Sequence, residues 1–276
     1  MADENIPVVI VTGANSGIGL AAALGFGRRG ARVALVGRDQ ARLDSAVDMV
    51  RAAAAPGAEP VGYQADFADL AQVRKLATTL RDTYARIDVL ANNAGAVIPR
   101  RVTTVDGYEL TIQVNHLAPF LLTNLLREQL SGGRVITTAS DAHQNGRLRA
   151  DDLSSTGHRY RAFTVYGSSK QANIAFAAEA ARRWPDIVSA SFHPGVVRIR
   201  FGRDIPVVST FFKFAFFLRT PEKGAETLLW LAQTVKVDSG GYYIDCRRRQ
   251  ASAATADAAM QAQLWAASAS AVGLTA

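Results

Sequence analysis

The chain is poor in cysteine and histidine: its 276 residues include one cysteine, Cys246, and four histidines. A single cysteine excludes an intramolecular disulfide and is typical of proteins from a reducing cytoplasm. The cysteine and the histidines do not have the spacing of a zinc site, so we expect no metal. Residues 1–7 are short and acidic and do not form a signal peptide, which predicts a cytoplasmic protein.

Long apolar runs are also missing. The most apolar and aromatic segment, 205–218, is too short for a transmembrane helix, which needs about 20 residues. This segment could close over a substrate as a lid, or it could lie on a membrane or a partner as an amphipathic element. We favour a lid formed by residues 199–220, and its composition predicts an apolar substrate.

A strong excess of one charge is absent as well. The net charge is +7, and the basic residues are spread along the chain. The short run Arg247–Arg249 is more typical of a solvated turn than of a nucleic-acid contact, which would need a concentrated basic patch. We therefore expect no nucleic-acid partner, and part of the charge favours an anionic cofactor.

Short apolar runs alternate with stretches rich in Ala, Leu and Arg that suit helices. This alternation predicts an α/β fold, a Rossmann-type doubly wound parallel sheet of about seven strands with helices on both faces. The length suits a single domain over residues 1–276. The expected strands are 8–12, 32–36, 60–64, 87–91, 133–138, 187–192 and about 241–244.

A glycine-rich turn follows the first expected strand. Gly13, Gly17 and Gly19 stand between a β-branched apolar run and an Ala-rich stretch. Small residues at a strand-to-helix turn let backbone amides approach a pyrophosphate, and the helix N-terminus adds partial positive charge. Glycines also serve tight turns, but the flanking strand and helix favour a dinucleotide site. The expected site includes the other residues of the turn, Asn15, Ser16 and Ile18.

Cofactor choice depends on the end of the second expected strand. An acidic residue there accepts a hydrogen bond from the ribose of NAD, whereas an arginine suits the 2′-phosphate of NADP. Gly37 stands where the carboxylate is expected and Arg38 follows it, which favours NADP(H) and leaves NAD(H) possible. The alternative is a solvated Arg38 at a turn, beside Asp39 as the N-cap of a helix over 40–55.

Tyr166 and Lys170 stand four residues apart in an Ala-rich segment that predicts a helix. Residues with this spacing lie on the same helix face. A nearby ammonium favours the phenolate and lowers the tyrosine pKa from its reference value of about 10. Such a pair occurs by chance in many helices, so its meaning depends on the other motifs.

These motifs together resemble the short-chain dehydrogenase/reductase family, and within it the retinol-dehydrogenase-like branch. The likeness runs from about residue 8 to residue 268, and the branch likeness lies in segments such as VNHLAPFLLTNLL, GAETLLWLA and GYYIDC. The shared motifs, in family order, are TGANSGIG at 12–19, Asp66–Phe67, NNAG at 92–95, Asn115, Ser140, YGSSK at 166–170 and HPG at 193–195.

The resemblance implies a catalytic set of four residues. Asn115 would sit in a local helix distortion and hold a water that touches Lys170. Ser140 would donate a hydrogen bond to the substrate oxygen. Tyr166 would be the acid in reduction and the base in oxidation, and Lys170 would bind the nicotinamide ribose. The helices with Asn115 and Tyr166 would also pair two copies, which implies a homodimer or homotetramer.

The resemblance further implies cofactor contacts along the chain. These would be Asp66 and Phe67 at the adenine, Asn93, Ala94 and Gly95 at the nucleoside, and Pro194, Gly195 and Val197 at the nicotinamide. Two positions depart from the family pattern. Ile199 stands where many relatives carry a threonine that holds the carboxamide, and Asn15 stands where some NADP-preferring relatives are basic.

The complete set favours an NADP-preferring oxidoreductase that interconverts an apolar alcohol and a ketone or aldehyde. A non-catalytic NADP(H)-binding sensor or scaffold of the same fold is the alternative, although it would not need the tyrosine and the lysine. The polar stretch 141–165 is interpreted as an insertion at the rim of the site. We expect His143 to be a loop residue that does not catalyse and His193 to be structural.

Overall fold

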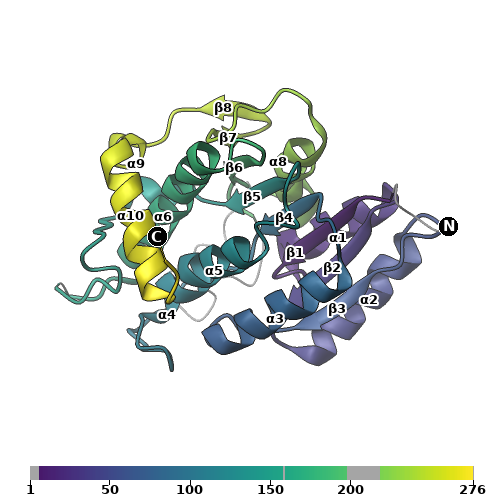
Figure 1. The fold of residues 1–276 in the computed structure, drawn as a ribbon, viewed down its shortest axis with the longest axis horizontal. Helices are drawn as coiled ribbons and strands as arrows, with labels where there is room; N and C mark the ends of the chain where they lie inside the picture. The colour runs from purple at the N-terminus through teal and green to yellow at the C-terminus, as the bar shows by residue number, and fades with distance from the viewer. Residues whose placement is uncertain (1–5, 158, 198–217, 276) are drawn as a thin grey trace.

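The computed structural model describes residues 6–157, 159–197 and 218–275. They form an eight-stranded sheet of order β3-β2-β1-β4-β5-β6-β7-β8, in which every neighbouring pair is parallel except the last (Figure 1). The strands are β1 (Val8–Thr12), β2 (Arg32–Gly37), β3 (Val61–Gln64), β4 (Val89–Asn92), β5 (Arg134–Thr138), β6 (Val188–His193), β7 (Tyr242–Ile244) and β8 (Arg247–Arg249). The doubly wound α/β prediction is confirmed.

The strand order reverses between β1 and β4. β1 pairs with β2 on one side and with β4 on the other, so the chain segments that leave β1 and β4 turn away from each other. In open parallel sheets, ligands bind in the crevice that this reversal leaves at the carboxyl ends of the strands. The glycine-rich turn after β1 and the NNAG motif at the end of β4 both lie at this crevice.

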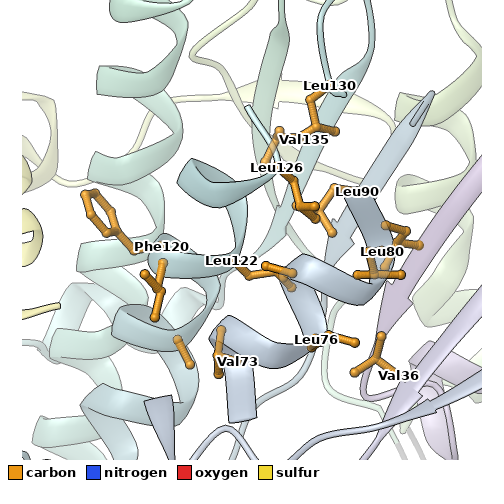
Figure 2. Close-up of a cluster of buried hydrophobic side chains, with 14 of the residues drawn as sticks. Val36, Val73, Leu76, Leu80, Leu90, Phe120, Leu122, Leu126, Leu130 and Val135 are labelled. Carbon is orange, nitrogen blue, oxygen red and sulfur yellow. The ribbon is translucent and has the colours of Figure 1, made fainter. Parts of the chain in front are cut away.

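Helices cover both faces of the sheet (Figure 1). One apolar cluster joins the sheet to α1 (Gly17–Arg28), α2 (Gln40–Ala53) and α8 (Pro221–Gln233). The opposite cluster joins it to α3 (Leu70–Thr83), α5 (Ala118–Leu125) and α6 (Ala162–Arg183), and part of this cluster is drawn in Figure 2. Successive residues of β1 alternate between the clusters, because side chains of a strand point to opposite faces. The short elements are α4 (Leu110–Ile112), η1 (Gln113–Leu117), η2 (Asp141–Asn145) and α9 (Ala253–Ala256).

The C-terminal helix α10 (Ala258–Ala271) lies along α6 (Figure 1). Its Trp265 is buried, with the ring centroid 4.9 Å from that of Phe120 in α5 and 5.8 Å from that of Phe176 in α6. Aromatic pairs at these separations stabilise packing beyond the area they bury. The chain therefore covers the outer side of α5 and α6 with its own C-terminal helix.

One local expectation is wrong. The run Arg247–Arg249 was expected to be a solvated turn, but it forms β8, an exposed edge strand antiparallel to β7. A tight turn at Asp245 and Cys246 reverses the chain and pairs the run with β7. The three arginines of the run have no composition typical of a strand, so the sequence did not predict this pairing. Charged side chains on an edge strand also discourage pairing with another chain.

Residues 198–217 lie outside the described residues, and so do Ile199 and nearly all of the expected lid at 199–220. Among the residues that the structure does describe, no helix combines the length and the apolar character needed to cross a membrane.

Candidate active site

The glycine-rich turn joins β1 to α1 at the crevice. Gly13 and Gly17 have φ angles of 65° and 55°, in the left-handed region that disfavours residues with a Cβ. Gly19 is tightly packed, because a Cβ there would collide with the carbonyl oxygen of Gly13. The three glycines therefore set the path of the backbone at the position predicted for a pyrophosphate.

The start of α1 is open to an anion. Ser16 is its exposed N-cap, the Ser16 hydroxyl makes no capping hydrogen bond, and the first turn has no acidic residue. The first amides of a helix lack intrahelical partners and carry partial positive charge, so a pyrophosphate fits this end. The side chain of Ile18 is buried against α8, near Gly224, and it leaves only its backbone for a nucleotide.

Arg38 follows β2 directly and is exposed. Within the described residues its guanidinium has no hydrogen-bond or ion-pair partner. Asp39 caps α2 by accepting a hydrogen bond from the Arg42 amide at 3.1 Å, as predicted for the N-cap. The start of α2 is thus capped without Arg38. The guanidinium of Arg38 is therefore available for a phosphate at the end of β2.

Asn15 closes the position where an NAD-type carboxylate was expected. A Cβ built on Gly37 would lie 3.3 Å from Cγ of Asn15. An acidic side chain at position 37 would therefore have to displace Asn15. This packing gives Asn15 a role beside the ribose position, although it adds no positive charge there.

Asp66 and Phe67 follow β3 at the same edge of the sheet. Oδ1 of Asp66 accepts a hydrogen bond from the Ala68 amide at 2.9 Å, and Oδ2 keeps its capacity to accept one from an adenine amino group. Phe67 is buried in the core, and its carbonyl accepts a hydrogen bond from Gln113 at 3.3 Å. Phe67 therefore anchors the segment that presents Asp66.

Asn93 ties together the ends of three strands. Its Nδ2 donates to the Thr12 carbonyl at 3.0 Å, and its Oδ1 accepts from the Thr138 hydroxyl at 3.3 Å. The Thr12 hydroxyl accepts hydrogen bonds from the amides of Asn93 and Ala94 at 2.9 and 3.0 Å. The Asn93 side chain thus hydrogen-bonds to the neighbouring strands. A nucleoside would therefore contact the backbone of this segment. Sequence reasoning missed Thr12, whose only signal is a hydroxyl just before the glycine-rich turn.

Asn115 lies in η1, a π-helical turn between α4 and α5, which confirms the predicted helix distortion. Its side-chain amide exchanges hydrogen bonds with the Ala96 backbone at 2.7 and 2.9 Å and donates to the Ser169 hydroxyl at 2.9 Å. Gly95 passes so close that a Cβ would lie 3.6 Å from Nζ of Lys170. Asn115 therefore binds the NNAG segment to α6, and π turns are frequent at functional sites.

Ser140 and Tyr166 meet at the carboxyl end of β5. Ser140 is the N-cap of η2, and its hydroxyl accepts a hydrogen bond from the Ala142 amide at 3.2 Å. The Tyr166 phenol projects from the first turns of α6 and lies near enough to the Ser140 side chain for that side chain to lower the phenol pKa. Two hydroxyl groups thus lie together, half-buried, where they can donate to one substrate oxygen.

Lys170 lies beneath the phenol and is 2% exposed. Its Nζ is 5.4 Å from the centre of the Tyr166 ring and donates to the Thr138 carbonyl at 2.9 Å. Burial disfavours the ammonium and lowers the pKa of Lys170 to about 7. Lys170 therefore titrates near neutral pH.

The expected effect of Lys170 on the tyrosine is not met in this structure. Burial raises the pKa of Tyr166 to about 12, and the nearby Ser140 side chain opposes this rise only in part. Burial disfavours the charged forms of both groups, so the phenol keeps its proton and Lys170 is only partly protonated near pH 7. The spacing of four residues predicted the contact correctly but could not show that packing buries Lys170 and half-buries Tyr166.

The segment Pro194–Val197 follows β6 at the same edge. Gly195 has a φ angle of 83°, and Val197 is buried and pairs with Arg219 in a short parallel bridge. His193, just before this segment, is buried with Nε2 3.5 Å from a carboxylate oxygen of Asp141. These residues are therefore placed where a nicotinamide beside Tyr166 could contact them.

His143 supports the site without facing the substrate oxygen. It is buried, its Nδ1 donates to the Ser140 carbonyl at 2.8 Å, and its Nε2 accepts from the Ser252 amide at 3.2 Å. Both ring nitrogens are thus satisfied in the neutral form. The stretch 141–165 begins with η2, which packs against the start of α6, so it lies beside Tyr166 as the insertion hypothesis expected.

Comparison with known proteins agrees with this geometry. A family model described as short chain dehydrogenase matches residues 7–205. The chain is 56% identical over 270 residues to the "Putative daunorubicin C-13 ketoreductase DnrU" of Streptomyces sp. (strain C5), covering 97% of this chain and 93% of that protein. It is 37% identical over 291 residues to retinol dehydrogenase 14 of Homo sapiens, covering 96% and 86%.

A solved structure shares the fold. The Pseudomonas aeruginosa RhlG/NADP active-site complex matches with a TM-score of 0.67 and 26% identity, over 86% of this chain and 93% of that one. The likeness to the retinol-dehydrogenase branch, expected from the motifs, is confirmed by the human relative. The chain therefore belongs to the short-chain dehydrogenase/reductase family.

Proposed function

We propose that this oxidoreductase reduces ketones with NADPH and that Tyr166 supplies the proton that completes the alcohol. The observation that carries the proposal is the meeting of Ser140, Tyr166 and Lys170 at the carboxyl edge of the sheet. A sensor or scaffold of the same fold would not need a buried ammonium next to a phenol. Two relatives of the chain are named as a ketoreductase and a dehydrogenase, which supports the proposal.

A bound nicotinamide cofactor would supply the hydride to the carbonyl carbon. Negative charge then builds on the carbonyl oxygen, and donors that are already in place stabilise it. Ser140 and Tyr166 are the two donors, and only Tyr166 transfers its proton, acting as a general acid. Lys170 stabilises the resulting phenolate through its positive charge beneath the ring.

The protonated phenol of Tyr166 is the form that carbonyl reduction needs. With a pKa raised to about 12, the phenol keeps its proton at neutral pH. We propose carbonyl reduction as the principal direction because the relative at 56% identity is named as a ketoreductase.

The cofactor preference is proposed to depend on Arg38. It is exposed and uncommitted at the end of β2, and the RhlG complex shows NADP bound to a related fold. The variant Arg38→Asp should lower the ratio of kcat/KM for NADPH over NADH by at least about tenfold, because it removes a charge-assisted hydrogen bond to the 2′-phosphate. Steady-state rates with both cofactors measure this ratio.

A matched control for Arg38 is Arg51→Asp. Arg51 is also exposed, but it lies at the far end of α2 in an ion pair with Asp48. We expect Arg51→Asp to leave the ratio of kcat/KM for NADPH over NADH at the wild-type value. A ratio that Arg38→Asp leaves unchanged would refute the phosphate role.

The substrate is proposed to be a ketone on a large apolar ring system. This proposal combines the aromatic lid segment with the ketoreductase relative at 56% identity. NADPH absorbance can be followed with daunorubicin, with retinal and with small polar ketones at equal concentration. We expect oxidation of NADPH with the polycyclic ketone and much slower oxidation with the small ketones. NADPH binding without turnover on any of them would favour the sensor alternative.

We also propose that the chain does not pair through α5 and α6, the helices for which the resemblance implied a dimer or tetramer. Residues 118–123 of α5 and 167–177 of α6 are all buried within one chain, and α10 covers them. A helix that is buried all round offers no apolar face to a second copy. Light scattering that gives the mass of one chain, 29.5 kDa, would agree with this proposal, and a crystal structure of a dimer paired through α5 and α6 would contradict it.

A further inference from the structure

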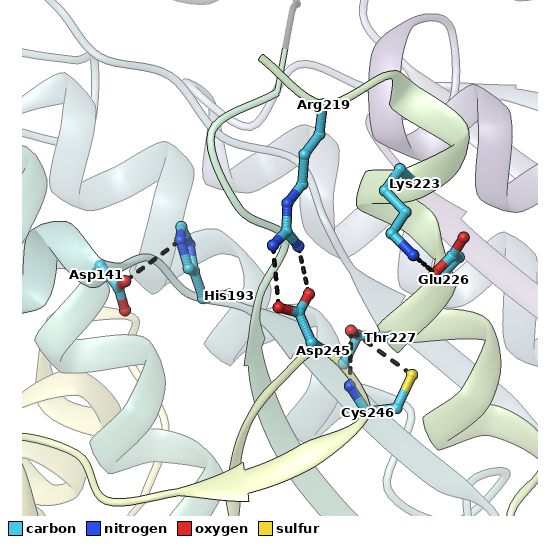
Figure 3. Close-up of polar contacts among 8 residues, drawn as sticks. All are labelled: Asp141, His193, Arg219, Lys223, Glu226, Thr227, Asp245 and Cys246. Atoms are coloured by element: carbon cyan, nitrogen blue, oxygen red, sulfur yellow. Dashed lines mark hydrogen bonds and ion pairs between the residues drawn. The ribbon is translucent and has the colours of Figure 1, made fainter. Parts of the chain in front are cut away.

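Arg219 lies against the segment that would border the nicotinamide (Figure 3). A Cβ built on Gly195 would lie 2.5 Å from Cδ of Arg219, so only a glycine leaves room for this side chain. The Arg219 amide donates to the Val196 carbonyl at 2.9 Å, and Val197 pairs with Arg219 in a parallel bridge. A single residue therefore contacts the whole of Gly195–Val197.

Asp245 holds the guanidinium of Arg219 in place (Figure 3). Its two carboxylate oxygens accept hydrogen bonds from Nη1 and Nη2, the second at 2.9 Å. This bidentate geometry fixes the plane of the guanidinium. The two side chains are 30% and 50% exposed, so the pair adds little to the free energy of unfolding. The ion pair instead fixes the position of the Arg219 side chain.

The turn that carries Asp245 is strained at Cys246. Asp245 and Cys246 form the turn between β7 and β8, with φ angles of 51° and 59°. Turns with two positive φ angles usually carry Asn, Asp or Gly, and other residues such as cysteine lose about 1 kcal/mol or more in this conformation. The Cys246 amide donates to the Thr227 hydroxyl at 3.2 Å, which ties the turn to α8. Strain that is held in place beside a site points to a functional constraint.

The same hairpin also supports the other side of the site. Tyr242 of β7 donates its hydroxyl to a carboxylate oxygen of Asp141 at 2.8 Å. Asp141 directly follows Ser140, and its other oxygen lies 3.5 Å from Nε2 of His193. β7 and its turn therefore contact the segments on both sides of the proposed reaction centre.

We infer that Arg219 and Asp245 are positioning residues, which fix Gly195–Val197 against the nicotinamide end of the cofactor. The inference rests on the proposed function, because it takes the nicotinamide to lie beside Gly195. Release of the segment would weaken binding of the complete cofactor and misplace its reactive end. It would not affect the adenosine end, which is proposed to lie at Arg38 and the start of α1.

The test uses two variants that keep the turn. Asp245→Gly and Asp245→Asn both tolerate a positive φ angle, so they remove the carboxylate without rebuilding the backbone. Dissociation constants are measured by titration for NADPH and for 2′-phospho-ADP-ribose, a fragment without the nicotinamide. We expect the NADPH constant to rise about tenfold and the fragment constant to stay within about twofold. Arg219→Met should change both dissociation constants as these variants do. A variant that combines Arg219→Met with Asp245→Gly should bind NADPH no more weakly than either single variant.

Glu226→Gln is the matched control. It breaks the neighbouring Lys223–Glu226 pair, which has a 2.6 Å contact (Figure 3). The atoms nearest to a Cβ on Gly195 belong to Arg219 and not to this pair. Both constants should stay at their wild-type values. Unchanged NADPH binding in Asp245→Gly, or equal weakening of both ligands, would overturn the positioning role. Wild-type protein that binds neither ligand would overturn the proposed function itself, and the positioning role with it, before any variant is compared.

Discussion

Tyr166→Phe is expected to lower kcat for carbonyl reduction by about 10³-fold while the dissociation constant for NADPH stays within about twofold. The substitution removes one hydroxyl and leaves the ring in place above Lys170. The Tyr166 hydroxyl carries the proton that is assigned to the substrate oxygen. Lys170 does not supply this proton, because its Nζ donates to the Thr138 carbonyl instead. Steady-state NADPH oxidation and a binding titration separate these two effects.

Tyr160→Phe is a suitable control for that variant. Burial also raises the pKa of Tyr160 to about 12, but its hydroxyl donates to the Ile98 carbonyl at 2.8 Å and does not contact Ser140. We expect kcat to stay within a few-fold of the wild type, because that hydroxyl holds a loop and transfers no proton. A Tyr166→Phe variant that keeps a tenth of the wild-type rate would contradict the assigned acid.

Lys170→Met is expected to abolish most turnover and yet to stabilise the fold. The lysine is buried, and no carboxylate among the described residues pairs with its ammonium, so burial of this charge lowers the stability of the folded protein. Removal of Nζ leaves no orphaned carbonyl, since the Thr138 carbonyl still accepts from Nδ2 of Asn173 at 3.0 Å. We expect the free energy of unfolding to rise by about 2 kcal/mol at pH 6, with kcat at least about 10²-fold lower.

The pH dependence of this stability gain follows from the lowered pKa. An unfolded chain keeps Lys170 protonated up to about pH 10.5, whereas the folded chain releases that proton above about pH 7. Between these values the unfolded state binds more protons, so wild-type stability rises with pH. The gain from Lys170→Met should therefore be largest below pH 7 and should shrink toward pH 10. Denaturant unfolding at pH 6 and pH 9 measures the difference in free energy of unfolding between the variant and the wild type. A Lys170→Met variant that is less stable than the wild type at pH 6 would contradict the proposed cost of burying the charge.

The sequence predicted the parts of the site that depend on short-range pattern. The spacing of Tyr166 and Lys170 on one helix face and the glycines after β1 follow from local geometry, and both predictions of local structure hold. The helix distortion at Asn115 came from the family resemblance and is confirmed as a π turn. The protonation states did not follow from the sequence, because burial depends on how distant segments pack around the helix.

The positioning pair shows most clearly what sequence alone could not give. Arg219 and Asp245 are 26 residues apart in the chain and meet because β7 pairs with β6, which places the turn at Asp245 beside the segment that follows β6. β8 consists of three arginines, so neither alternation nor β-branched residues predict it. The role of α10 was equally hidden, since an Ala-rich terminal segment predicts a helix but not that Trp265 covers α5 and α6.

The most direct test of the central claim is a mass measurement of the product. Wild-type protein is incubated with a polycyclic ketone and NADPH that carries deuterium at both C4 positions of the nicotinamide. The account predicts an alcohol one mass unit heavier than the product made with ordinary NADPH, and almost none of it with Tyr166→Phe. Tight NADPH binding with no deuterium in any product, across polycyclic, retinoid and small ketones, would contradict the reductase and favour a nucleotide sensor.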